Sequence, residues 1–216
     1  MRVLIVDDHA LVRDGIRMLL QQEPGLEVCG EAEGVVDAKR RIDALAPDIV
    51  IVDLIKDGNG LDLIKWIGKF HPDIKTIVAT MHEERVYGGR ALQAGATGFV
   101  SKQANSRAII EAIRALRRNR FYFSEALTKR ILQRARSGNT HLERTPIEGL
   151  SDRELEVFRL MGAGRTTREI ASLLHLSPST VDTYRGRLRQ KLQLSNTTEL
   201  SFEATRWALE QEHASS

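Results

Sequence analysis

The sequence predicts an α/β domain with a doubly wound parallel sheet, followed by a smaller all-α domain. Two patterns along the chain predict this order. In the first half, short β-branched runs alternate with stretches whose apolar residues recur at helical spacing. In the second half, helix-start signals follow one another at short intervals. The charge changes as well: residues 1–117 hold 16 basic and 17 acidic residues, so the net charge of +3 arises in the second half.

The β-branched runs are the expected strands of the first domain. They span residues 3–6, 26–30, 49–52, 76–79 and 98–100. The first and third runs are almost continuously apolar, as is typical of strands covered by helices on both faces. Five strands alternating with five helices over residues 1–118 predict a doubly wound sheet. The functional crevice of such a sheet lies beyond the carboxyl ends of its strands.

Polar side chains stand where these strands are expected to end. The first strand runs into Asp7 and Asp8, the third into Asp53, the fourth into Thr80 and the fifth into Lys102. Carboxylates brought together at one edge repel one another unless a cation lies among them, and hard oxygen ligands suit Mg²⁺. A divalent cation, an ammonium group and a hydroxyl could together hold a phosphoryl group. The sequence therefore predicts a magnesium-dependent phosphoryl site.

A simpler interpretation of the acidic residues stays open. Acidic residues often follow strands because they cap the helices that come next. Nucleotide binding of the P-loop or Rossmann type has no support, because neither GxxxxGK[ST] nor GxGxxG occurs in the chain.

Residues 1–118 resemble the receiver domain of two-component response regulators, which has a flavodoxin-like fold. The matching segments are the VDDH opening, the IVDL strand end, Thr80 and AGATGFVSK. The resemblance implies that Asp53 is the phosphoacceptor. It also implies that Mg²⁺ is held by Asp7, Asp8, Asp53 and the backbone carbonyl of Ile55. Thr80 and Phe99 would be the switch pair, and Lys102 the partner of the phosphoryl group. Phe99 is also open to a simpler interpretation, that of an ordinary core aromatic.

The chain departs from the receiver pattern after Asp53. Receivers usually have Met-Pro at the third and fourth positions after the acceptor, whereas this chain has Lys56 and Asp57, and Gly60 arrives one residue early. Losing the proline removes a fixed φ beside the expected metal. A second departure is the Gly88-Gly89 pair inside the fourth expected helix, which predicts a soft helix or a break there.

Residues 119–149 are expected to be a linker that contains a helix. The segment FYFSEALTKRILQRA has helical character, and the following RARSGNTHLERTPIEG is poor in apolar residues and broken by glycine and proline. The helix could pack on the receiver domain as an extension of it.

Residues 150–210 are expected to fold into four helices. Their start signals are a capping box from Ser151 to Glu154, a second from Thr166 to Glu169, Ser177 before Pro178, and Asn196 with Glu199. Only His175 and Leu176 separate the second helix from the third, which is the spacing of a helix-turn-helix.

The third of these helices is the expected nucleic-acid-binding element. Residues 165–191 hold six basic residues against two acidic ones. Val181, Leu188 and Leu192 would face inward, which leaves the cationic residues facing outward, as in a helix that enters the major groove. An ordinary amphipathic surface helix would show the same pattern.

Residues 150–209 resemble the LuxR-type helix-turn-helix domain of NarL/FixJ response regulators, over the segment from LSDRELEVFRLMGAG to GRLRQKLQL. The resemblance implies that the DNA-contacting residues are Thr167, Arg168, Ser179, Thr180, Asp182, Thr183, Arg187 and Arg189. Within this set, Ser179, Asp182 and Thr183 would read bases, whereas Thr167 and the three arginines would contact phosphates. Gly186 cannot supply the cation that some members carry at that position, and Asp182 replaces a frequent lysine. The last helix, around Leu200 and Trp207, would be a dimer face or ordinary core.

The composition favours a soluble cytoplasmic protein. No apolar run approaches the roughly 18–20 residues that a membrane span needs, and Met1 leads into a strand-like segment without a signal peptide. Cys29 is the only cysteine, which excludes an intrachain disulfide and a thiolate metal cluster.

The sequence therefore predicts a response regulator that binds DNA and is switched when a cognate histidine kinase phosphorylates Asp53. It is expected not to be an enzyme, to use Mg²⁺, to bind double-stranded DNA, to dimerise when active and to have RNA polymerase as a possible partner. A regulator that works without phosphorylation is one alternative, supported only by the altered loop at Lys56 and Asp57. A magnesium-dependent phosphohydrolase is another, but Ile55 stands where such enzymes usually place an acid/base carboxylate.

Overall fold

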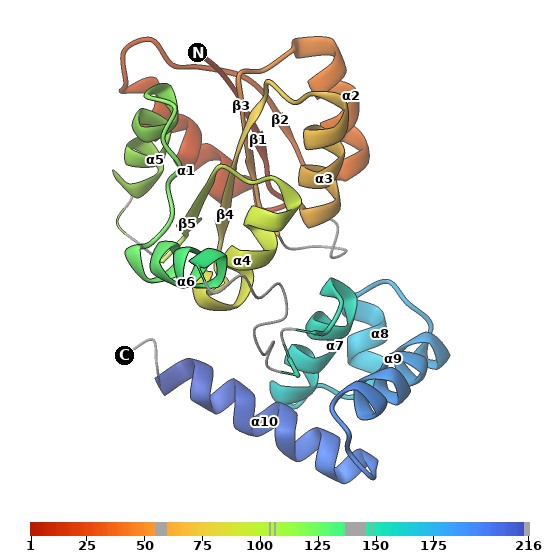
Figure 1. The fold of residues 1–216 in the computed structure, drawn as a ribbon. Helices are drawn as coiled ribbons and strands as arrows, with labels where there is room; N and C mark the ends of the chain where they lie inside the picture. Colours follow the sequence, from red (N-terminus) through yellow and green to blue (C-terminus); the bar gives the residue numbers. More distant parts are fainter. Residues whose placement is uncertain (55–59, 104, 106, 137–145, 148, 214–216) are drawn as a thin grey trace. The chain divides into compact units, whose positions relative to one another are not determined.

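The computed structural model describes residues 1–54, 60–103, 105, 107–136, 146–147 and 149–213. The chain divides into two compact units, residues 1–140 and residues 141–216, which are coloured from red to green and from teal to blue in Figure 1.

The first unit is built on the predicted parallel sheet. Its strands are β1 (Arg2–Val6), β2 (Glu27–Ala32), β3 (Ile49–Val52), β4 (Lys75–Thr80) and β5 (Gly98–Ser101). Every pairing is parallel, and the spatial order is β2-β1-β3-β4-β5. β1 and β3 are buried almost completely, which agrees with their continuous apolar sequence. The doubly wound fold class is confirmed.

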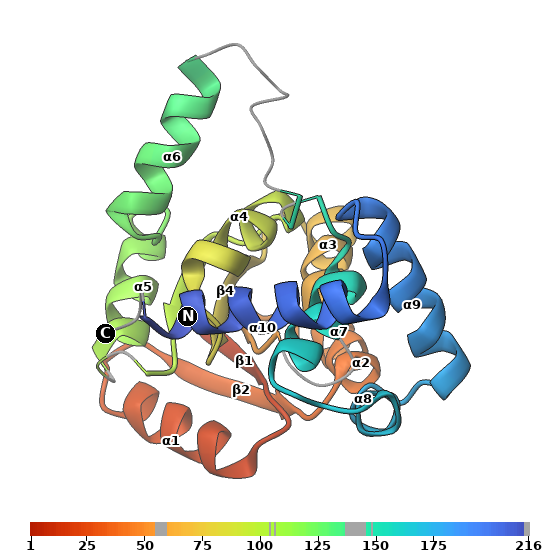
Figure 2. The same cartoon turned by 90° about the horizontal axis from the view of Figure 1, so that it is seen from below.

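Helices cover both faces of this sheet (Figures 1 and 2). They are α1 (Ala10–Gln21), α2 (Val35–Leu45), α3 (Gly60–Phe70), α4 (Glu84–Ala94) and α5 (Arg107–Arg117). α1 and α5 cover one face of the sheet. Their buried side chains Ile16, Leu20 and Ile113 form one core cluster with Val3 and Ile5 of β1 and with Ile49 and Ile51 of β3. α2, α3 and α4 cover the opposite face.

The strand order fixes where a site can form. The chain leaves β1 toward β2 on one side, and β3 lies on its other side, so the connections diverge between β1 and β3. A crevice opens at such a switch point, at the carboxyl ends of the strands. Asp7 and Asp53 directly follow these two strands.

The chain after α5 stays attached to the first unit. Tyr122 pairs with β5, because its backbone N–H donates to the Thr97 carbonyl at 3.0 Å and its carbonyl accepts from the Phe99 N–H at 2.8 Å. Helix α6 (Glu125–Arg136) then lies against α4, where it buries Leu127. This segment thus forms a helix that packs on the first unit.

The second unit contains the four predicted helices: α7 (Asp152–Gly162), α8 (Thr167–Leu173), α9 (Pro178–Lys191) and α10 (Thr197–His213). Both predicted capping boxes form, at Ser151 with Glu154 and at Thr166 with Glu169, and Ser177 caps α9. The core gathers Phe158, Ile170, Val181, Leu188 and Leu200, one or more from every helix. None of the described helices is long and apolar enough to cross a membrane.

Candidate functional site

The side chains predicted at the strand ends do meet at one edge of the sheet. Lys102 is the centre of the group: its Nζ lies 2.7 Å from Asp7 Oδ2 and also contacts Asp53 Oδ2 directly. The side chains of both aspartates are 2% exposed and that of Lys102 is 10% exposed. Two carboxylates and one ammonium group are therefore held together away from solvent.

Sheet hydrogen bonds place these residues. Val6 pairs with Val52 in the β1–β3 register, so the next residue of each strand, Asp7 or Asp53, lies at the same level. The Asp53 N–H donates to the Val6 carbonyl at 2.9 Å, and the Lys102 N–H donates to the Thr80 carbonyl at 2.8 Å. The backbone ladder continues one residue past each strand, which fixes the three side chains relative to one another.

Asp8 and His9 complete the acidic edge. The His9 backbone N–H donates to Asp7 Oδ1 at 2.9 Å, and its imidazole Nδ1 lies 2.9 Å from Asp8 Oδ1. Ligand atoms of Asp7, Asp8, His9 and Asp53 all lie within 4.8 Å of one another. The sequence analysis did not predict His9 as a member of this group, although His9 directly follows the acidic pair.

Burial and the contacts between the charged groups together set the pKa values in the pocket. Burial raises the pKa of Asp53, the negative charge of Asp7 adds to the rise, and Lys102 opposes it. Burial alone would lower the pKa of Lys102, but its contacts with Asp53 and Asp7 outweigh burial and raise it. The pocket holds more negative charge than Lys102 balances, so it favours a further cation.

The residues present fit a magnesium ion. Asp53 Oδ1 is buried and has no hydrogen-bond partner among the described residues. A buried, unpaired carboxylate oxygen is costly unless a ligand completes it. Carboxylate oxygens from Asp7, Asp8 and Asp53 are the hard donors that Mg²⁺ takes. The fourth predicted ligand, the Ile55 carbonyl, and the loop residues Lys56 and Asp57 lie outside the described residues.

Thr80 and Phe99 lie on neighbouring strands, and the Thr80 side chain reaches Asp53. Thr80 ends β4, is fully buried, and its hydroxyl accepts from the His82 N–H at 3.3 Å. Phe99 lies on β5 and is 4% exposed, so it also serves as core. The switch role of this pair stays a prediction, and the burial of Phe99 also fits its simpler interpretation as a core aromatic.

Two further residues shape the pocket through contacts that the sequence analysis did not predict. The guanidinium group of Arg13 donates to the Asp7 backbone carbonyl at 2.7 Å. Gly60 lies against the end of β3, where a Cβ would come within 2.5 Å of the Asp53 carbonyl oxygen. The early position of Gly60 was visible in the sequence, whereas the contact of Arg13 is tertiary and leaves no local pattern.

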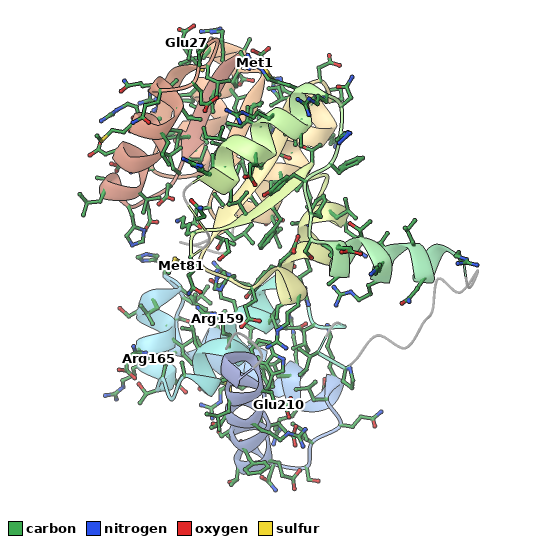
Figure 3. The ribbon with its side chains drawn as sticks, turned by 90° about the vertical axis from the view of Figure 1, so that its left-hand side faces the viewer. Met1, Glu27, Met81, Arg159, Arg165 and Glu210 are labelled. Atoms are coloured by element: carbon green, nitrogen blue, oxygen red, sulfur yellow. The ribbon has the colours of Figure 1, made fainter. Side chains whose placement is uncertain are left out.

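In the second unit, α8 and α9 present most of the predicted DNA-contacting side chains to solvent. Arg168, Ser179, Asp182, Thr183 and Arg187 are exposed. Val181 and Leu188 are fully buried, so the outward direction of the polar face of α9 is as predicted. Arg165 extends from the surface of the segment between α7 and α8 (Figure 3).

The other predicted DNA-contacting side chains are hydrogen-bonded within the second unit or partly buried. The Thr167 hydroxyl accepts from Arg185 Nη1 at 2.5 Å, and the hydroxyls of Thr180 and Ser177 lie 2.8 Å apart. Thr167, Thr180 and Arg189 are half-buried. Arg185 of α9 thus bridges to α8. The sequence analysis included Arg185 among the basic residues of 165–191 but did not predict this contact.

Both units match models of known families. Residues 3–114 match the response regulator receiver domain, and residues 148–204 match bacterial regulatory proteins of the luxR family. The response regulator GacA of Pseudomonas viridiflava is 35% identical over 206 residues, which are 95% of each chain. The response regulator UvrY of Escherichia coli O6:H1 is 36% identical over 209 residues, 96% of this chain and 94% of that protein.

Solved structures give the same result. RcsB from Salmonella enterica serovar Typhimurium, bound to a promoter in the presence of the phosphomimetic BeF3⁻, is 29% identical and has a TM-score of 0.64. The match covers 95% of this chain and 98% of that one. A LuxR-family two-component response regulator from Aurantimonas matches 62% of this chain, at 31% identity and a TM-score of 0.57. The chain belongs to the two-component response regulators of the NarL/FixJ type, which join a receiver domain to a LuxR-type DNA-binding domain.

Proposed function

We propose that Asp53 is the phosphoacceptor of this regulator and that its phosphorylation controls DNA binding. The observation that carries the proposal is the buried, unpartnered Oδ1 of Asp53, which lies beside a lysine and a second carboxylate at the switch point of the sheet. The carboxylate of Asp53 would supply the attacking oxygen, and the developing phosphoryl charge needs positive groups placed in advance.

The proposed reaction moves one phosphoryl group. An oxygen of Asp53 attacks phosphorus, the P–N bond to an imidazole of a cognate histidine kinase breaks, and that imidazole leaves and takes up a proton. Lys102 faces the phosphoryl oxygens and the Thr80 hydroxyl donates to one of them. When bound by Asp7, Asp8, Asp53 and the Ile55 carbonyl, Mg²⁺ supplies charge neutralisation at the phosphoryl group.

The proposed output is DNA binding by α8 and α9. Ser179, Asp182 and Thr183 are the base-reading candidates, because they lie exposed near the amino end of α9. Arg168, Arg187 and Arg189 are the phosphate-contacting candidates, and Thr167 and Thr180 support them. We place this activity in the cytoplasm, with two copies of the chain on paired half-sites, and RNA polymerase as a further partner.

Phosphoryl uptake tests the proposal directly. Full-length protein is incubated with Mg²⁺ and acetyl phosphate, and mass spectrometry follows the addition of one phosphoryl group. We expect the wild type and Asp62→Asn, an exposed-carboxylate control on α3, to be labelled and Asp53→Asn to stay unlabelled. Equal labelling of Asp53→Asn would overturn the assignment. Sustained release of phosphate from esters would instead favour a phosphohydrolase.

A further inference from the structure

Arg13 is a buried cation next to the acidic edge of the pocket. It lies in the second turn of α1, and its side chain is 10% exposed. Each of its three nitrogens has a different partner. Nη1 donates to the Asp7 backbone carbonyl at 2.7 Å, Nε to Glu31 Oε2 at 3.2 Å, and Nη2 to Glu33 Oε1 at 2.8 Å.

The contact with the Asp7 carbonyl fixes one particular peptide plane. That carbonyl and the Asp8 N–H belong to the same planar peptide group, which joins the two carboxylates of the acidic pair. On the other side of Asp7, its own N–H donates to the Ala32 carbonyl at 3.0 Å. The backbone of Asp7 is therefore held at both ends, which fixes the points from which the Asp7 and Asp8 side chains leave the main chain.

The two glutamates explain how a cation can lie beside a cation-binding site. An unbalanced positive charge there would repel a divalent ion. Glu31 and Glu33 compensate the charge of Arg13, and Arg17 holds Glu31 in place through a 2.6 Å contact from its Nη1. Arg13 thus acts on the pocket as a rigid, charge-compensated hydrogen-bond donor.

We propose that Arg13 is a positioning residue, which orients the Asp7–Asp8 pair for a divalent cation. This inference rests on the magnesium site of the proposed function and adds to it a residue that touches neither the ion nor the phosphoryl group. Partners that orient metal ligands typically contribute 10–100-fold in metal affinity.

The test compares three variants of the full-length protein. Arg13→Met removes all three hydrogen bonds while keeping an unbranched side chain, and Arg13→Lys keeps the charge but cannot reach three partners. Arg17→Met is the matched control, because Arg17 pairs with the same Glu31 and does not contact Asp7. Mg²⁺ is titrated in, with amide chemical shifts giving its Kd and thermal unfolding giving stability.

We expect Arg13→Met to raise the Kd for Mg²⁺ by about tenfold, Arg13→Lys to raise it less, and Arg17→Met to leave it within about twofold. At saturating Mg²⁺, acetyl phosphate should label both Arg13 variants at close to the wild-type rate, because Asp53, Thr80 and Lys102 are unchanged. If Arg13→Met does not fold, Arg13→Lys decides.

A folded Arg13 variant with the Kd of Arg17→Met would overturn the proposal and leave Arg13 a purely structural link between α1 and β2. Failure of the proposed function would look different. In that case the wild-type protein itself would bind no Mg²⁺, or would bind it and take up no phosphoryl group.

Discussion

Asp53 is held in an environment that opposes its own charge. It is buried next to Asp7, one of its oxygens has no partner among the described residues, and its pKa is raised chiefly by burial. A carboxyl group whose pKa is higher in the folded than in the unfolded state favours folding only while it is protonated. Its stabilising effect is lost as the pH rises from the ordinary aspartate value, about 3.9, through the raised pKa.

Asp53→Asn should therefore stabilise the protein at neutral pH without metal. We expect a gain of about 0.5–2 kcal/mol, which disappears below about pH 4 because both side chains are then neutral. Lys102 keeps Asp7 as its partner in the variant. The measurement is urea unfolding across pH in EDTA, and added Mg²⁺ should shrink the difference by stabilising only the wild type. A variant less stable than the wild type at neutral pH would contradict this account of the pocket.

Asp182 places a negative charge on the face of α9 that is proposed to meet DNA. A phosphate backbone repels a carboxylate, whereas a cytosine amino group can donate to one. Asp182→Ala should thus bind random duplexes more tightly and lose about 1–3 kcal/mol of discrimination at one base pair of a selected site.

Asp73→Ala is the charge-matched control for this prediction, because Asp73 is exposed in the first unit. Fluorescence anisotropy with selected and mismatched duplexes provides the measurement. Equal effects of both substitutions would mean that net charge alone acts, and Asp182 would read no base.

Among the helices, α7 and α8 begin with the same capping box in two different settings. Glu154 is buried and accepts from Lys191 Nζ of α9 at 2.6 Å, whereas Glu169 is exposed. Burial would raise the pKa of Glu154, but the bonds from Lys191 and Ser151 outweigh it and lower the pKa. A lowered pKa adds stability that is present at neutral pH and lost as the pH falls below the ordinary glutamate value.

Glu154→Gln should therefore destabilise the second unit at pH 7 by about 1–3 kcal/mol, because Lys191 loses a charged partner. Glu169→Gln should have a smaller effect. Unfolding followed by circular dichroism at a series of pH values should show that the difference in unfolding free energy between Glu154→Gln and the wild type narrows as the pH falls from 7. If this difference in unfolding free energy did not change with pH, the Glu154–Lys191 ion pair would add no stability beyond that of the helix cap.

The first glycine of the pair in α4 packs closely against α6. A Cβ at position 88 would lie 2.7 Å from Leu127 Cδ2 and 2.7 Å from Glu84 Cγ, whereas the nearest atom to a Cβ at position 89 is 3.7 Å away. Ser124 and Arg130 add hydrogen bonds from this segment to Glu84 and to the Arg85 carbonyl. Gly88 thus leaves room for the linker helix. Because α4 is continuous from Glu84 to Ala94, the glycine pair does not break it, and the softness of this helix stays a prediction.

We predict different effects on stability for two alanine substitutions in α4. Gly89→Ala should stabilise the first unit by about 1 kcal/mol through helix propensity. Gly88→Ala should lack that gain, because Leu127 must move, and amide hydrogen exchange in α6 should become faster. Similar exchange rates in the two variants would mean that Leu127 adapts without loosening α6.

Local patterns predicted the elements well, for physical reasons that particular residues show. The capping boxes at Ser151 and Thr166 are complete within four residues, and apolar continuity alone marks β1 and β3 as doubly covered. Arg13, Gly88 and Arg185 could not be interpreted in this way. Their partners lie far away in sequence, so only the folded chain shows what they do.

At the scale of the whole molecule, two units with different chemistry share one chain. The first holds a buried acidic pocket, and its linker helix packs on α4, close in sequence to Thr80. The second carries the exposed polar face of α9. In the proposed function, phosphorylation in the first unit is coupled to DNA binding by the second. An aspartyl phosphate adds charge in the first unit, and the DNA affinity of the second unit changes in response.

The affinity of the full-length protein for DNA, with and without phosphorylation, tests this coupling most directly. Duplexes selected from a random pool are titrated with wild type and Asp53→Asn, each with Mg²⁺ and with or without acetyl phosphate. We predict that acetyl phosphate lowers the Kd of the wild type by about tenfold, a typical coupling of 1–3 kcal/mol, and leaves Asp53→Asn unchanged. An unchanged Kd for fully phosphorylated wild type, or an equal gain in Asp53→Asn, would contradict it.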